Sequence, residues 1–148
     1  ILDLGLDGLI PYVQTINLYR TKAQHLIEAC RILIDRFHGE VPRTRDELIS
    51  LPGVGRKTAN VVMNVAFGEP AIAVDTHIFR LSRLWGLSTG KTVETVERDL
   101  KSLFPEKSWG DLHLRIVLYG REYCPARGCG GRCPICSRLA RESGCEGV

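Results

Sequence analysis

The sequence predicts an all-α protein, and three observations carry this prediction. Apolar residues recur at helical spacing along most of the 148 residues. No segment alternates apolar and polar residues as a half-buried strand would, and the helical segments are separated by short stretches rich in glycine and proline. We therefore expect two helical lobes that divide the chain into residues 1–105 and residues 106–148.

The first predicted helix spans residues 21–37, and Gly39 lies just beyond its end. Its expected apolar face consists of Leu26, Cys30, Leu33 and Phe37, with Ile27 and Ile34 beside them. Thr44, followed three residues later by Glu47, forms a capping-box pattern. This pattern predicts the start of a short helix that runs through Ser50.

The next predicted helix spans residues 56–67 and has two different faces. Its apolar stripe contains Ala59, Val62, Met63 and Ala66, whereas Lys57, Asn60 and Asn64 share a polar face. Asp75 is placed to cap a further helix. Helices are also expected over residues 92–103 and 109–120, and the cysteine-rich segment that follows is expected to be coil.

Composition excludes some classes of protein. The formal charge of +3 and the pI near 8.6 suit contact with a polyanion, but many other proteins share these values. The sequence has no run of about 18 apolar residues and no secretory signal, so we expect an intracellular protein without a membrane span. The first residue is Ile1 instead of methionine, and we expect the chain to be part of a longer one.

The segment between residues 51 and 58 points to an anion as a partner. Gly53 and Gly55 flank Val54 between the end of one predicted helix and the start of the next. Glycine lets the main chain approach an anion closely, and the unpaired N–H groups at a helix start carry partial positive charge. A phosphate could bind there, although an ordinary tight helix–helix turn would contain the same residues.

Two motifs together resemble the endonuclease III superfamily of DNA glycosylases. The first is Leu-Pro-Gly-Val-Gly-Arg-Lys-Thr-Ala at residues 51–59, and the second is Val-Asp-Thr-His at residues 74–77. The resemblance implies a helix-hairpin-helix fold that binds DNA across a cleft between two lobes. It also implies that DNA is contacted by Gly53, Val54, Gly55, Arg56 and Thr58.

The same resemblance implies a bifunctional base-excision repair enzyme with Lys57 and Asp75 as its catalytic residues. The enzyme would remove oxidised pyrimidines and cleave abasic sites by β-elimination through a lysine Schiff base. A helix start disfavours a cation, which favours the neutral amine that attack requires. Most helical lysines are solvated surface groups, and Asp75 could act solely as a helix cap.

Leu18 lies where the family carries a wedge that fills the gap left by a flipped base. An ordinary exposed loop leucine is the alternative.

The resemblance also implies a partner, a location and an oligomeric state. The implied partner is double-stranded DNA that contains damaged bases or abasic sites, and the implied protein is a cytoplasmic, nucleoid-associated monomer.

Five of the six cysteines lie between residues 124 and 145, which favours a metal site over disulfides. The resemblance implies a four-iron four-sulfur cluster bound by Cys124, Cys133, Cys136 and Cys145. The family spacing is C-x6-C-x2-C-x5-C, whereas these residues give C-x8-C-x2-C-x8-C. The extra Cys129 could replace Cys124 or be a bystander, and a zinc site with four cysteines is an alternative.

Six arginines and a single acidic residue lie between positions 115 and 141, so this part of the chain is locally basic. Arginine suits contact with phosphate, although a solvated basic loop would look the same.

Two other functions compete with that of a bifunctional enzyme: a non-catalytic module that only binds DNA, and a monofunctional glycosylase. Borohydride trapping on abasic-site DNA distinguishes both from a lyase, because neither forms a Schiff base.

Overall fold

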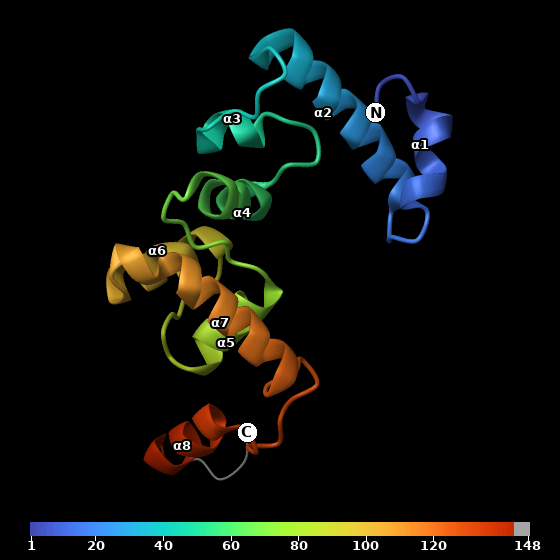
Figure 1. Cartoon of the computed structure of the whole chain (residues 1–148). Coiled ribbons are helices and arrows are strands. Elements are labelled where there is room, and N and C mark those ends of the chain that lie inside the picture. Colours follow the sequence, from blue (N-terminus) through green and yellow to red (C-terminus); the bar gives the residue numbers. More distant parts are fainter. Residues whose placement is uncertain (144–148) are drawn as a thin grey trace. The chain divides into compact units, whose positions relative to one another are not determined.

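The computed structural model describes residues 1–143, with side chains described as far as residue 139, and every regular element in this range is helical (Figure 1). The elements are α1 (Gly5–Val13), α2 (Tyr19–Phe37), α3 (Arg45–Ile49), α4 (Arg56–Phe67), α5 (Thr76–Leu84), α6 (Val93–Leu103), η1 (Glu106–Ser108), α7 (Trp109–Glu122) and α8 (Pro134–Ser143). The all-α prediction is confirmed. Among these elements, no helix has both the length and the apolar character needed to cross a membrane.

The chain forms two compact units, Ile1–Met63 and Asn64–Val148. The division after residue 105 that the sequence predicts for the two lobes stays a prediction.

In the first unit, α1 packs against α2, and the two helices bury Leu9, Ala23 and Ile27 between them. The predicted inward face of α2 is wrong at Leu26, which is 40% exposed. The buried positions Ala23 and Ile27 form a neighbouring stripe because α1 covers that side of the helix. Helix α1 was not predicted from the sequence, because its nine residues include two glycines and Pro11, all poor helix formers.

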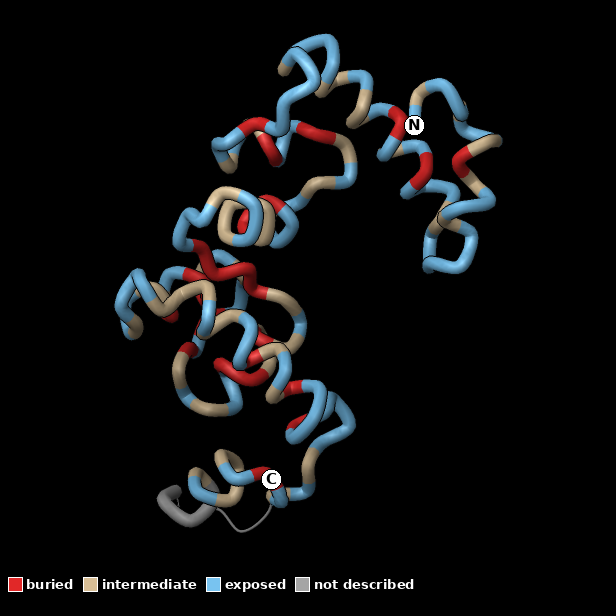
Figure 2. Tube along the Cα trace, viewed as in Figure 1, coloured by how far each residue is buried: buried red, intermediate tan, exposed pale blue. Residues whose placement is uncertain are grey.

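The second unit is built around α5, which packs against both α6 and α7. Its core contains Ile72, Val74, Ile78, Leu81, Val96, Leu100, Ile116, Cys124 and Cys133 (Figure 2). Residues 71–74, which lead into α5, are all buried in the core. Asp75 follows them directly and is the N-cap residue of α5, so its backbone position is fixed on both sides. Two cysteines of the predicted metal site therefore belong to the hydrophobic core itself.

Local capping sets the predicted helix starts correctly. The Thr44 and Thr92 hydroxyls accept hydrogen bonds from the N–H groups of Glu47 and Thr95. The coil expected after α7 is wrong in part, because α8 begins at Pro134. Proline is preset for the first helical position, and the ten residues of α8 contain no glycine.

Candidate DNA-binding hairpin and metal centre

The hairpin between α3 and α4 contains two glycines with different structural demands. Gly53 has a φ of 76°, and an added Cβ there would lie 3.0 Å from Nδ1 of His25 on α2. Gly55 has no such φ, and an added Cβ would meet nothing within 4 Å. Gly53 is thus required by the fold, whereas Gly55 leaves open space at the start of α4, where the helix N–H groups lack intrahelical partners.

These two glycines give a matched pair of substitutions. Gly53→Ala is expected to lower the free energy of unfolding by about 1–2 kcal/mol, because alanine is strained at positive φ and would press on His25. Gly55→Ala is expected to leave thermal stability nearly unchanged and, if the predicted phosphate site is correct, to weaken binding to abasic-site duplex, since a methyl group would occupy the space in which the phosphate is expected. Thermal melts and fluorescence anisotropy measure the two effects. Equal binding by Gly55→Ala and the unaltered protein would contradict the phosphate site.

Lys57 lies in the first turn of α4, directly after the hairpin, and is exposed. Asp75 caps α5 by accepting a hydrogen bond of 2.8 Å from the N–H of Ile78. The two residues belong to different units, so their pairing stays a prediction. Asn60, which was expected on the polar face with Lys57, is only 1% exposed. The polar face of α4 is therefore narrower than its sequence indicated.

Leu18 immediately precedes α2 and has two unusual properties. Its side chain is 75% exposed, and its φ of 59° lies in the left-handed region, which leucine seldom adopts. An exposed apolar side chain buries no surface, and a leucine with positive φ is strained, so neither feature stabilises the free protein. The strain therefore favours a role in contact with a partner.

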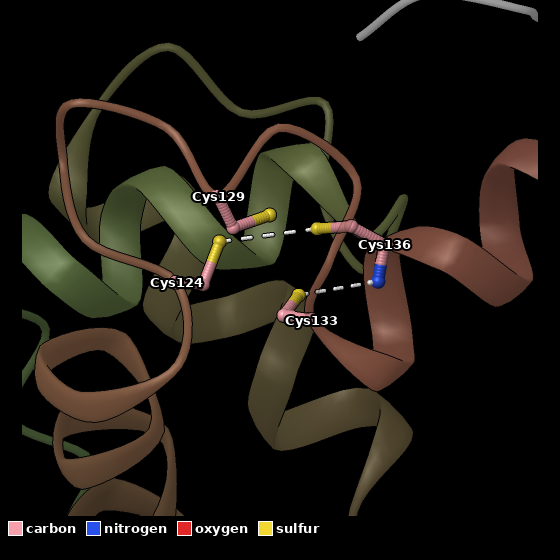
Figure 3. A group of neighbouring side chains, drawn as sticks. All are labelled: Cys124, Cys129, Cys133 and Cys136. Carbon is pink, nitrogen blue, oxygen red and sulfur yellow. Dashed lines mark hydrogen bonds between the residues drawn. The ribbon is translucent and has the colours of Figure 1, made fainter.

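Four cysteines converge at the end of α7, in the loop that follows and at the start of α8 (Figure 3). The sulfur atoms of Cys124, Cys129, Cys133 and Cys136 all lie within 4.8 Å of one another. The sulfurs of Cys124 and Cys136 are 3.8 Å apart, and the N–H of Cys136 donates to the sulfur of Cys133. Cys145, the fourth predicted ligand, lies outside the described residues.

Cys129 joins the group because the loop between Cys124 and Cys133 turns back at this position. Three glycines of this loop have positive φ and surround Cys129; they are Gly128, Gly130 and Gly131. The carbonyl of Cys129 accepts hydrogen bonds from the backbone and side chain of Arg132, which fixes the second half of the turn. A backbone hydrogen bond from Cys133 lowers the pKa of the Cys129 thiol to about 6, so the thiolate predominates at neutral pH.

Arg80 on α5 supports the cysteine loop from the core side. Its guanidinium donates to the sulfur of Cys124 at 3.8 Å and to the carbonyl oxygen of the same residue. Burial raises the pKa of the Cys124 thiol, and the hydrogen bond from Arg80 acts in the opposite direction. Arg80 was not predicted as a site residue, because nothing in its helical position indicates a contact with a residue 44 positions later in the sequence.

A cavity of about 760 Å³ opens beside the sulfurs. Its wall includes Arg80, Arg83 and Arg127 together with Cys124, Cys129 and Cys136. Guanidinium groups here would offset the negative charge that thiolates carry when they bind a metal.

The donor set fits a thiolate-bound metal centre. Four free thiols within 4.8 Å of one another either oxidise or bind metal, and thiolates are the ligands of iron–sulfur clusters and of structural zinc. Hydrogen bonds already reach the sulfurs of Cys124 and Cys133, as is usual for metal-bound thiolates. The fold and this site define an all-α helix-hairpin-helix protein with a cluster of four thiols suited to bind a metal.

Comparisons with known proteins agree with this class. The family model described as "HhH-GPD superfamily base excision DNA repair protein" matches residues 1–106. Endonuclease III of Haemophilus influenzae is 49% identical over 146 residues, which are 99% of this chain and 67% of that protein. Endonuclease III of Escherichia coli K12 is 48% identical over 98% of this chain and 66% of its own length. The chain thus spans about two thirds of the length of these curated relatives.

Solved structures give the same result. A trapped endonuclease III–DNA covalent intermediate superposes with a TM-score of 0.86 at 46% identity, over 90% of this chain and 64% of that one. A non-covalent endonuclease III–DNA complex gives a TM-score of 0.87 at 42% identity, over 95% and 69% of the two chains. The chain belongs to the endonuclease III family of the HhH-GPD superfamily. In a member of this family, the four clustered thiols are consistent with a four-iron four-sulfur cluster.

Proposed function

We propose that the protein containing this chain is a DNA glycosylase that removes oxidised pyrimidines and cleaves the resulting abasic site. The observation that carries the proposal is an exposed lysine, Lys57, in the first helical turn after the hairpin of an endonuclease III family member. A relative has been solved as a covalent DNA intermediate. Borohydride reduction in the presence of abasic-site duplex tests the proposal, because it traps a lysine Schiff base and leaves a simple DNA-binding module uncoupled.

The proposed chemistry needs an amine and a carboxylate. The Lys57 amine attacks C1′ of the damaged nucleoside as the bond to the base breaks, and loss of the ring oxygen's bond to C1′ gives the Schiff base. The Schiff base acidifies the C2′ hydrogens, so a proton leaves C2′ and the 3′ phosphate departs by β-elimination. Asp75 stabilises the positive charge that develops on the sugar and assists proton transfer around the amine.

The two proposed roles of Asp75, capping and catalysis, can be separated by substitution. Asn is as good a cap as Asp, so Asp75→Asn is expected to retain the melting temperature and to lose base excision by about 10²-fold or more. Asp75→Ala is expected to lose activity and, in addition, about 1 kcal/mol of stability through the missing cap. Single-turnover glycosylase assays and thermal melts measure these effects. Full activity of Asp75→Asn would leave Asp75 as a cap alone.

The proposed partner is duplex DNA with a damaged base or an abasic site. The hairpin residues Gly53, Val54, Gly55, Arg56 and Thr58 would hold its phosphates, and Leu18 would fill the gap left by the flipped base. The exposure of Leu18 and its left-handed backbone support this role. Such an enzyme acts where the chromosome lies, so we place it in the cytoplasm at the nucleoid, and we propose that it acts as a monomer.

For the metal centre, we propose Cys124, Cys133 and Cys136 as three ligands of the iron–sulfur cluster. Cys129 supplies the fourth thiolate, because its sulfur lies with the other three among the described residues. Cys145, which the family order of cysteines indicates, is then not needed for binding. When bound, the cluster would hold the arginine-bearing loop in place for contact with phosphate.

A further inference from the structure

His25 on α2 packs directly against the hairpin between α3 and α4. The hairpin residue that it meets is Gly53, which has no side chain and a φ of 76°. An added Cβ at Gly53 would lie 3.0 Å from Nδ1, 3.1 Å from Cβ and 3.3 Å from Cγ of His25. The contact is therefore too close for a side chain at Gly53, and it joins the hairpin to α2.

Packing is the contact that His25 makes with the rest of the described chain. The residue is half-buried, and within residues 1–139 its ring makes no hydrogen bond and no ion pair. The atoms that approach Gly53 are Cβ, Cγ and Nδ1, which form the inner part of the side chain. The volume and shape of this inner part thus determine how closely the hairpin approaches α2.

The same helix carries Leu18, the proposed wedge, at its start. The carbonyl oxygen of Leu18 accepts a hydrogen bond of 3.0 Å from the N–H of Lys22, so the backbone of Leu18 is fixed to the first turn of α2. His25 lies seven residues further on, which corresponds to about 10 Å along a helix and to the same face. All these residues and the hairpin belong to the unit Ile1–Met63. One face of a single helix therefore holds both the proposed wedge and the hairpin.

We propose that His25 is a positioning residue for DNA binding, which packs against Gly53 and so holds the hairpin at the distance from Leu18 that a duplex with an extruded base requires. This inference rests on the proposed function of the hairpin and of Leu18. A duplex fixes the spacing between its phosphates and the gap left by an extruded base, so both contacts form together only if the spacing in the protein matches. Without the side chain of His25, the hairpin still binds phosphate, but the gap no longer lies at Leu18.

Variants of the full-length protein test this role. His25→Ala removes the atoms Cγ and Nδ1 that meet Gly53, whereas His25→Asn keeps a Cγ and a planar polar atom in the place of Nδ1. Gln24→Ala is the matched control, because Gln24 is an exposed polar residue of the same helix. Fluorescence anisotropy measures the affinity for undamaged duplex and for duplex with a tetrahydrofuran analogue of an abasic site. Thermal melts check that each variant is folded.

For His25→Ala we expect the affinity for undamaged duplex to stay within about twofold of that of the unaltered protein, while the preference for the abasic-site analogue falls about fivefold or more. His25→Asn and Gln24→Ala are expected to keep the preference. An equal loss of affinity for both duplexes in His25→Ala would indicate a general effect on the fold and overturn the inference. A loss of preference in His25→Asn as large as that in His25→Ala would overturn it as well.

A double substitution separates positioning from a direct contact between His25 and DNA. If His25 acts by aligning the hairpin with Leu18, then His25→Ala causes no further loss of preference in the Leu18→Ala background. Additive losses would overturn the inference and assign His25 a DNA contact of its own. Borohydride trapping tests the proposed enzyme separately: a protein that is not trapped but prefers the abasic-site analogue would refute the enzyme, and the variants would still decide the role of His25. An unaltered protein that is trapped without any such preference would overturn the inference alone.

Discussion

Replacing Lys57 with alanine is expected to abolish borohydride trapping on abasic-site duplex and to lower strand cleavage by at least about 10³-fold. The reason is that no other group at the start of α4 can form the Schiff base through which β-elimination proceeds. The measurement uses the full-length protein and end-labelled duplex, with the covalent adduct resolved on a denaturing gel. Peptide mapping of the adduct from the unaltered protein should place the DNA on residue 57.

The matched control is Lys91→Ala, which removes another exposed lysine and should trap as efficiently as the unaltered protein. Binding affinity separates the proposed enzyme from a simple DNA-binding module. If Lys57 served only as a phosphate contact, its removal would weaken binding to damaged and undamaged duplex alike, and the unaltered protein would form no adduct. An adduct that persists in Lys57→Ala would assign the nucleophile to another amine.

Replacing Cys129 with serine is expected to remove most of the bound iron and sulfide and to lower the melting temperature. This thiol lies within 4.8 Å of the other three sulfurs, and two of its partners, Cys124 and Cys133, are buried in the core of the second unit. Loss of the metal would therefore leave free thiols in the core and loosen the loop anchored on α7. Metal analysis, absorbance in the visible range and thermal melts measure the effect.

Cys145→Ser and Cys30→Ser serve as the comparison variants. We expect Cys145→Ser to keep its iron, since Cys129 completes the set of four sulfurs. Cys30 lies on α2 in the first unit, so its replacement controls for the general effect of removing a thiol. Loss of iron in Cys145→Ser with retention in Cys129→Ser would restore the ligand set that the family order of cysteines indicates.

Much of the helical framework could be predicted from the sequence because helix starts depend on neighbours only three residues apart. The Thr44 and Asp75 caps form as expected, each between a side chain and the N–H three positions later, and Thr92 caps α6 in the same way. The turn between α3 and α4 was also predicted correctly. Glycine is common where a turn needs a positive φ, and Gly53 has such a φ. The failure to predict α1 and α8 has a common cause: the effect of proline and glycine on a helix depends on where in the helix they lie.

The inward face of α2 and the burial of Asn60 could not be read from spacing. Periodicity shows that a helix has two faces, but the packing partner decides which residues are covered, and α1 covers Ala23 and Ile27 instead of Leu26.

By itself, the sequence determined the helices from α2 to α7, the glycine turn between α3 and α4 and the presence of a nucleophile candidate at a helix start, because each depends on interactions within one or two helical turns. Which thiols converge, and which distant residues support them, was decided only by the tertiary structure. Cys129 reaches the other sulfurs through a loop bent at three left-handed glycines. Arg80 reaches Cys124 from another helix. Such contacts depend on the path of the chain through space, and the spacing of residues along the sequence does not reveal that path.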